Sequence, residues 1–535
     1  MHSLVFFCAQ KVISDHASTR KALDSIPHEI YPVLFKAAFL DQRILVLRDL
    51  VQMWPFAELN FSSILKKSKH CDQDMIREKP NKQCLQAVIL GVKDYVINEL
   101  RQNRSLTSRK TRASTSKDKY TFRKPKAAAP KDRNKSRKNR LLRIVDLTGF
   151  PDDGDNQDED TISQWSRSVA LAKACIEVSR TSKREEYNSS KRRKGKGGVP
   201  MKGSCDSQMC VNIHANLFIT SHSYGTVKDA LHLSQTFPLC LKCRVLRVEE
   251  LSVKKTISIL ELLDPMVLRK IELRYNNLGL CCLSTVFPYI PRFVNLNSLK
   301  LPYSNIDVRY MTLEVEEFFQ KMVSVLSQLP NLKELNLVSS RLSGRIRELL
   351  SVLQQPLESL ELAYCFLLPA DVTYLASSHH AATLKKLDVS GNNLSDVLLN
   401  PFCQLLQQAS NSLIYLDIME CRVMDRQLSA FLPALRQCSQ LQYFSCFCNP
   451  ISSEGLKSLL HCVVELPNLK VVVHPNPVDC YEEGLPWPPS TYDLIDYSVD
   501  QEKLSRVDAE LNEIRLNAVR TDIVTTVKLY NIEWY

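Results

Sequence analysis

The fold is decided by the stretch Leu384-Lys-Lys-Leu387-Asp-Val389-Ser-Gly-Asn392-Asn-Leu394, which fits the leucine-rich repeat pattern L-x-x-L-x-L-x-x-(N/C/S)-x-L. Further copies of the pattern are spaced 25 to 36 residues apart and begin at Leu268, Leu296, Leu332, Leu357, Leu413 and Leu441. In repeats of this length a short strand is followed by a helix, and neither element can bury its apolar face without neighbouring repeats. The sequence therefore predicts an α/β leucine-rich repeat solenoid.

Changes in composition divide the chain into five regions. Residues 101–143 contain 17 Lys and Arg against two Asp, a local net charge of +15, and too few apolar residues to offset the entropy of ordering. Removing that segment and the net +6 of residues 183–202 from the total of +12 leaves −9 for the rest of the chain. The predicted regions are an N-terminal helical region (1–100), a basic disordered insert (101–140), atypical opening repeats with an acidic loop at 151–160 and a basic loop at 181–204 (141–267), a horseshoe of regular repeats of the long, ribonuclease-inhibitor-like kind (268–478), and a C-terminal strap with a helical cap (479–535).

The 18 cysteines are interpreted as reduced thiols, because the N-terminus lacks a basic segment followed by a signal-peptide cleavage site. No stretch approaches the roughly 18 uninterrupted apolar residues of a membrane span. We therefore predict a cytoplasmic protein that does not interact with membranes. The basic run Lys191-Arg192-Arg193-Lys194 predicts a nuclear fraction, if it acts as an import signal.

A zinc site is the alternative interpretation for one group of cysteines and a histidine. The apolar residues between Leu239 and Leu246 alternate as in a repeat strand, and this favours core packing instead. We therefore predict neither a metal nor a cofactor; the group in question comprises Cys205, Cys210, His214, Cys240 and Cys243.

Several stretches resemble the PRAME family of leucine-rich proteins. They are the helix and turn Leu45-Val-Leu-Arg-Asp-Leu-Val-Gln-Met-Trp54-Pro-Phe56, the stretch from Ile26 to Lys36, and residues 86–91, 273–280 and 473–481. The resemblance implies a non-catalytic protein-interaction module. One branch of the family is associated with dampening Toll-like receptor and NF-κB signalling by binding the IκB kinase complex, so the resemblance also implies those kinase subunits as partners. The two basic inserts depart from the family pattern, so their role is not implied.

The resemblance draws attention to two short N-terminal patterns. The first fits the elongin-binding box and comprises Ser3, Leu4, Cys8 and Val12; the second fits the cullin-2 box and comprises Ile26, Pro27, Ile30 and Leu34. Residues four apart share one face of a helix, so the first pattern presents a leucine and a small thiol on one stripe. The alternative is that these residues only pack a cap onto the first repeat. Together the patterns predict elongin B/C and cullin-2 as partners.

The strand residues between the leucines are expected to face the concave side of the solenoid. Carboxylates on adjacent strands there are unfavourable unless a cationic partner offsets them, although a simply solvated row is an equal alternative. Aromatic neighbours favour a protein partner over nucleic acid. The predicted partner-binding residues are Glu272, Arg274, Tyr275, Lys300, Tyr303, Glu361, Tyr364, Asp388, Tyr415, Asp417, Tyr443 and Phe447.

Three functions therefore compete. The first is substrate recognition for an elongin BC–cullin-2 ubiquitin ligase, and the second is stoichiometric inhibition of the IκB kinase complex without ubiquitin transfer. The third, a nuclear nucleic-acid-associated role, is disfavoured because the basic runs contain few aromatic residues for base stacking. No phosphate-binding glycine loop, paired-histidine motif or nucleophile elbow is present, so we predict that the protein is not an enzyme.

Overall fold

The computed structural model describes residues 3–65, 82–114, 142–148, 166–194, 210–234, 238–310, 312–394 and 396–528, with the side chains of 103–114, 185–194 and 396 left aside. The chain divides into two compact units. The first comprises residues 1–247 and 258–268, and the second comprises 248–257 and 269–535. Within the described ranges, no helix has both the length and the apolar character needed to span a bilayer.

The first unit begins with a cluster of short helices, α1 (Leu4–Val12), α2 (His16–Ala22), α3 (Tyr31–Leu40) and α4 (Ile44–Gln52). Aromatic rings form its core, with Phe35 edge-on to Phe61 at 5.2 Å and to Trp54 at 5.8 Å between ring centroids. Trp54 Nε1 donates to the carbonyl of Glu58 at 2.9 Å. This bond ties the helical cluster to the first strand.

Four strands follow in this unit, and their spatial order is their chain order: β1 (Glu58–Asn60), β2 (Ile144–Asp146), β3 (Val211–Ile219) and β4 (Leu239–Glu249). β1 pairs with β2, and β2 with β3, in parallel. The short α5 (Phe61–Ile64) and the long α7 (Lys82–Ser114) follow β1; α9 (Arg167–Lys194), α10 (Tyr224–Leu233) and α11 (Val253–Leu260) follow the next three strands. Strand–helix repetition therefore starts at Glu58, earlier than the sequence predicted, and the N-terminal region is not purely helical.

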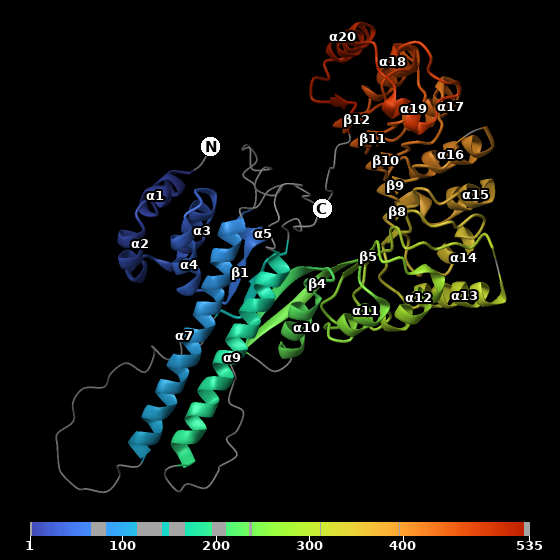
Figure 1. The fold of residues 1–535 in the computed structure, drawn as a ribbon. Helices are drawn as coiled ribbons and strands as arrows, with labels where there is room; N and C mark the ends of the chain where they lie inside the picture. Colours follow the sequence, from blue (N-terminus) through green and yellow to red (C-terminus); the bar gives the residue numbers. More distant parts are fainter. Residues whose placement is uncertain are drawn as a thin grey trace, which may run out of the picture. The chain divides into compact units, whose positions relative to one another are not determined.

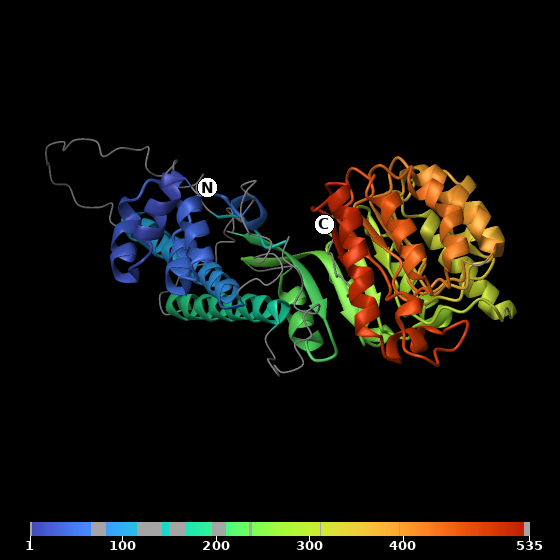
Figure 2. The same cartoon turned by 90° about the horizontal axis from the view of Figure 1, so that it is seen from above.

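α7 and α9 lie side by side (Figures 1 and 2), and Lys93 Nζ is 2.8 Å from Glu177 Oε2 between them. α7 also packs on α4, where a Cβ at Gly91 would come within 2.8 Å of Val51 Cβ. Glycine at this position therefore permits the close approach of the two helices.

The helix bounds correct two sequence expectations. α7 continues to Ser114, so the first residues of the expected disordered insert are helical. α9 continues to Lys194, so the expected basic loop at 181–204 starts as a helix, and the predicted import signal stands at its end. A helix whose first turns are fixed by packing propagates readily through Arg, Lys, Gln and Leu. The rest of both inserts, the acidic segment 151–160 and Cys205 lie outside the described residues.

The second unit confirms the predicted leucine-rich repeat solenoid. Parallel strands line its inner side and helices its outer side (Figure 1). The strands are β5 (Lys270–Arg274), β6 (Ser298–Lys300), β7 (Glu334–Asn336), β8 (Ser359–Glu361), β9 (Lys386–Asp388), β10 (Tyr415–Asp417), β11 (Tyr443–Ser445) and β12 (Val471–Val473). The helices are α12 (Gly279–Val286), α13 (Leu313–Ser327), α14 (Ile346–Leu350), α15 (Pro369–Ser377), α16 (Asp396–Ala409), α17 (Asp425–Leu435) and α18 (Ser453–Val463).

In the repeats that have Asn or Cys after the strand, this side chain holds the turn that leaves the strand. Asn449 Nδ2 donates to the carbonyl of Ile418 in the preceding repeat at 2.9 Å, and its Oδ1 accepts from Val423 N–H at 2.9 Å. Cys421 Sγ lies 3.4 Å from the carbonyl of Val389 and supplies the equivalent, weaker contact. These side chains are structural and connect neighbouring repeats.

The C-terminal segment closes the array as the sequence predicted, with one addition. α19 (Thr491–Asp496) precedes α20 (Gln501–Asn517), which packs on α18 and buries Val507 and Leu511. The chain then forms β13 (Val524–Thr526), which pairs with β12 in parallel and was not predicted. β13 is therefore the last strand of the sheet among the described residues.

Candidate functional site

An exposed apolar stripe lies on α1. Leu4 is 78% exposed, Phe7 56% and Val12 40%, and Cys8 is also exposed. The opposite face of the helix is buried through Phe6, Ala9 and Ile13. Ser3 caps the helix, because its Oγ accepts from Phe6 N–H at 3.3 Å. The three apolar or thiol positions of the predicted elongin-binding box therefore face solvent.

The residues of the predicted cullin-2 box are not equally accessible. Pro27 is exposed, and Ile26 and Ile30 are half-buried beside the short turn His28–Ile30. Leu34 is only 1% exposed, within the core face of α3. Leu34 therefore serves the helical core, and only the first three residues of this box can contact a partner in this conformation.

The strand registers place the concave residues of the second unit in two rows. One row follows the first residue of β7 to β12, namely Glu334, Ser359, Lys386, Tyr415, Tyr443 and Val471; the other follows the last residue of β6 to β12, namely Lys300, Asn336, Glu361, Asp388, Asp417, Ser445 and Val473. Glu361, Asp388 and Asp417 consequently stand on adjacent strands, as the sequence predicted.

Glu361 is already neutralised within the chain. Lys300 Nζ lies 3.3 Å from one carboxylate oxygen, and Lys386 Nζ lies 3.0 Å from the other. Burial opposes ionisation of Glu361, but the two lysines outweigh it and lower its pKa to about 2. Glu272 is similarly paired, with its Oε1 2.8 Å from Arg274 Nη2. These predicted partner-binding charges are therefore committed to internal ion pairs.

Asp388 and Asp417 are in a different situation. They are register partners on β9 and β10, and neither carboxylate forms an ion pair with the side chains that the structure describes. Burial, together with the charge of Asp417, raises the pKa of Asp388 to about 7, and burial also raises the pKa of Asp417. Two negative charges at this position are therefore unfavourable near neutral pH.

The predicted aromatic residues fall into two groups. Tyr275 and Tyr303 are stacked at 4.8 Å between centroids and are 51% and 43% exposed. Both stand in the turn after a strand with positive φ, as does Tyr364, whose ring covers Gly391. These rings line the edge of the sheet where the strands end.

The other group lies on the strands themselves. Tyr415 and Tyr443 stack at 4.3 Å with nearly parallel rings, and Lys386 Nζ lies 5.0 Å from the Tyr415 ring centroid. Tyr443 is only 2% exposed, because it packs with Val471 and Phe447. It was predicted as a contact residue, but it belongs to a buried apolar cluster that borders the acidic pair. Sequence reasoning missed Lys386 and Ser390, although Lys386 shares the alternation that places Asp388 on the concave side.

Two of the candidate zinc residues form a thiol pair. Cys210 Sγ lies 3.1 Å from Cys240 Sγ, and this contact lowers the pKa of Cys210 to about 7. Among the described residues, no three His, Cys, Asp or Glu side chains are grouped as metal ligands. The remaining candidate cysteine of the 205–214 group, Cys205, lies outside the described residues.

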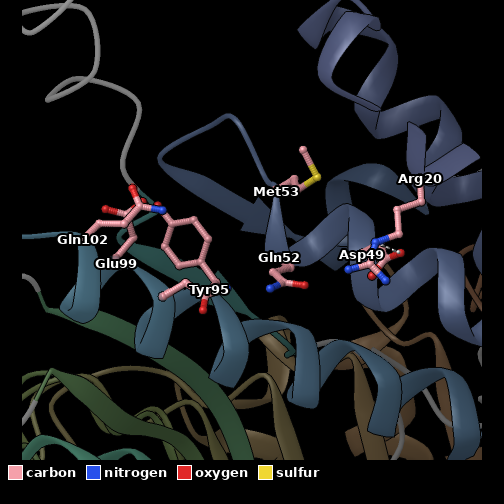
Figure 3. Close-up of a pocket in the computed structure, with 8 residues that line it drawn as sticks. Arg20, Asp49, Gln52, Met53, Tyr95, Glu99 and Gln102 are labelled. Carbon is pink, nitrogen blue, oxygen red and sulfur yellow. Dashed lines mark ion pairs between the residues drawn. The ribbon is translucent and has the colours of Figure 1, made fainter. Parts of the chain in front are cut away.

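A cavity of about 230 Å³ lies in the first unit, and Figure 3 shows that its lining side chains come from α2, α4 and α7. Arg20 Nε and Asp49 Oδ2 lie 3.8 Å apart at one side of it, and Tyr95 and Glu99 lie at the other. Sites for organic ligands are usually larger and mostly apolar. No ligand class follows from this cavity.

Comparison with known proteins shows the family. Models of the PRAME N-terminal and C-terminal domains match residues 2–97 and 227–529. Leucine-rich repeat-containing protein 14 from Xenopus laevis is 48% identical, and that from Homo sapiens 40% identical, each over 99% of this chain and 98% of the relative. Human PRAME family member 12 is 26% identical over 90% of this chain and 85% of its own.

Two solved structures align at 14% identity. The Rad7 and Elc1 complex of yeast gives a TM-score of 0.26 over 51% of this chain and 83% of that chain. An internalin from Listeria monocytogenes gives 0.25 over 60% and 86%. The family models and full-length relatives are the informative matches. The chain therefore belongs to the PRAME family of leucine-rich repeat proteins, as its N-terminal and repeat motifs implied.

Proposed function

We propose that this protein is a non-catalytic adaptor, which binds elongin B/C and cullin-2 through its N-terminal helices and a protein substrate through the concave face of its second unit. The observation that carries the proposal is the exposed stripe of Leu4, Cys8 and Val12 on α1. It supports the elongin box because those positions are available to a partner, whereas core packing would bury them.

The stripe is also energetically informative. Leu4 and Phe7 leave most of their apolar surface in water, and burying one such side chain stabilises an assembly by roughly 1.5–3 kcal/mol. A leucine flanked by a small thiol suits a partner pocket that receives one helix face. Cullin-2 contact then rests on Ile26, Pro27 and Ile30, which lie near the same helices.

The test is capture of purified elongin B/C by the full chain and by Leu4→Ser/Cys8→Ser. We expect the double variant to lose at least tenfold in affinity and to keep its melting temperature, since both side chains face solvent. Val5→Ser is the matched control, because Val5 is 49% exposed on the same helix but stands outside the box. Unchanged capture by the double variant, or equal loss with Val5→Ser, would refute the assignment.

The burial of Leu34 favours a second candidate, a stoichiometric inhibitor without ligase activity. In this version, the likeness to leucine-rich repeat-containing protein 14 implies that the repeats bind the IκB kinase complex and thereby dampen Toll-like receptor and NF-κB signalling. Binding alone would suffice. Co-purification from cells distinguishes the two, because kinase subunits recovered without elongins support inhibition, and elongins recovered with cullin-2 support the adaptor.

A further inference from the structure

The concave row contains one carboxylate that the chain neutralises and two that it does not. Glu361 receives Lys300 from β6 and Lys386 from β9. Asp388 and Asp417, which follow it in the same row, have no such cation among the described residues. Two lysines therefore neutralise the buried carboxylate of Glu361, whereas no lysine or arginine among the described residues neutralises Asp388 or Asp417.

The carboxylate oxygens of Asp388 and Asp417 can accept more hydrogen bonds than they receive within the chain. Asp388 Oδ1 accepts from Ser390 N–H at 3.0 Å, and Asp417 Oδ1 accepts from Met419 N–H at 3.1 Å. The Tyr415 hydroxyl donates to Asp417 Oδ2 at 3.1 Å. Asp388 remains partly exposed, so a group entering from the concave side can reach it.

Two buried hydroxyls point to a missing partner. Ser445 is fully buried and is the register partner of Asp417, and Ser390 is 2% exposed and follows Asp388 by two residues. Both hydroxyls lie close enough to Asp417 to favour its ionised form, yet neither Oγ makes a well-formed hydrogen bond. An unsatisfied buried hydroxyl is unfavourable, and both hydroxyls can donate to the carboxylates once these are ionised, so the four side chains together favour a bound cation.

We propose that Asp388, Asp417, Ser390 and Ser445 form a receptor for one basic side chain of a protein partner, arginine in preference to lysine. The inference rests on the proposed function, because it specifies what the concave face recognises. A guanidinium supplies five N–H donors in a planar fork, which matches two adjacent carboxylates better than the three donors of an ammonium. A divalent ion fits less well, because two carboxylates are the only charged ligands and calcium requires six to eight oxygens.

Binding of a cation should release a proton. The titratable or charged groups around Asp388 are Glu361, Lys386, Tyr303, Tyr364, Tyr415, Asp417, Tyr443 and the thiols Cys365 and Cys421, whose pKa values burial raises. Burial raises the pKa of all four tyrosines, so they remain neutral near pH 7. The acidic pair is therefore the group that changes charge there, and affinity for a cation should rise as pH increases through 7.

The experiment titrates the full chain with acetyl-Gly-Arg-Gly-amide and with its lysine and citrulline analogues by ligand-observed NMR. We expect the arginine peptide to bind about tenfold more tightly than the citrulline peptide, and several-fold more tightly at pH 8 than at pH 6. Asp388→Asn/Asp417→Asn should abolish that preference. Each asparagine keeps a side-chain oxygen that can accept from the backbone N–H of Ser390 or Met419, so the double variant should remain folded.

The matched control is Glu334→Gln, which removes one charge from the same face but from an existing ion pair with Lys270. It should change the arginine preference less than twofold. Equal binding of the arginine and citrulline peptides, an unchanged preference in Asp388→Asn/Asp417→Asn, or competition by micromolar Ca²⁺ would overturn the inference. None of these variants changes the proposed elongin-binding box. If the wild-type chain does not capture elongin, this result refutes the adaptor function and leaves the arginine receptor untouched.

Discussion

At the scale of single residues, Asp388 links stability to pH. Its pKa is raised from 3.8 to about 7 in the folded chain, so the stabilisation from its protonation is complete below about pH 4 and is lost as pH rises through 7. Asp388→Asn removes this dependence while keeping an oxygen acceptor for Ser390 N–H. We expect the variant to gain of order 1–3 kcal/mol relative to wild type between pH 5 and pH 8, measured by urea unfolding.

Asp307→Asn provides the contrasting case. The hydrogen bond with Arg309 lowers the pKa of Asp307 in the folded chain. The change of stability with pH therefore has the opposite sign, and the stabilisation is present above the pKa that Asp307 has in the unfolded chain. This variant should gain nothing relative to wild type as pH rises from 5 to 8. A parallel gain in both variants would contradict the role assigned to the concave pair.

Two features require glycine at position 391, namely the adjacent ring of Tyr364 and the positive φ of the backbone. A Cβ there would come within 2.2 Å of Tyr364 Cδ1, and the residue has a φ of +67°. Gly391→Ala should therefore destabilise the chain by about 1–3 kcal/mol, measured by urea unfolding. Gly225→Ala, at a helical glycine with open space around it, should be neutral or stabilising. Adding Tyr364→Ala should recover part of the loss, since it removes the clashing ring.

At the scale of elements, the turn asparagines Asn392 and Asn449 each join one repeat to the preceding one. Asn449→Ala removes the bonds to Ile418 O and from Val423 N–H, which are both buried. We expect a loss of about 2 kcal/mol or more, because two backbone groups are left unsatisfied. Cys421→Ala should cost less, since a thiol is a weak donor. Denaturant midpoints for the two variants provide the comparison, and equal losses would show that burial, not hydrogen bonding, matters at this position.

The regular strands were predictable because the leucines of the repeat pattern recur at the positions that face the core. β1 was missed because Glu58-Leu59-Asn60 offers one buried leucine in three residues, too short a pattern to indicate a strand. The extension of α7 was missed because its charge density was interpreted as disorder, whereas helix propagation depends on turns that are already packed.

For the candidate site, the sequence predicts the rows but not the partners within them. Lys300 and Lys386 reach Glu361 from strands two before and one after it in the sheet. Such side-chain directions depend on curvature and rotamers that repeat spacing does not encode. Tyr443 is similarly buried by Val471 of the next repeat. The shared face of Leu4, Cys8 and Val12 on α1, in contrast, follows directly from helical spacing, whereas its exposure is a finding of the structure.

At the scale of the whole molecule, the basic charge is concentrated outside the repeats. Deleting residues 115–140, which begin after α7 ends, should change the melting temperature by less than about 2 °C, because this Lys- and Arg-rich stretch contains few apolar side chains. Retention on heparin should fall sharply, since phosphate and sulfate affinity follows the density of positive charge. The matched control replaces Lys191 to Lys194 with alanine. Loss of the thermal transition on deletion would show that the segment packs.

The second unit adds its strands in the order in which the chain is made. β6 to β12 each pair with the strand immediately before and after them in sequence, so most contacts join residues about one repeat apart, and contact order is low. A chain emerging from the ribosome can complete one layer before the next has been synthesised. β13 differs from these strands, because the strap and α20 must be synthesised before β13 can pair with β12. During synthesis each newly paired strand therefore offers its open edge to the next one, and β13 is the edge strand of the sheet in the described part of the chain.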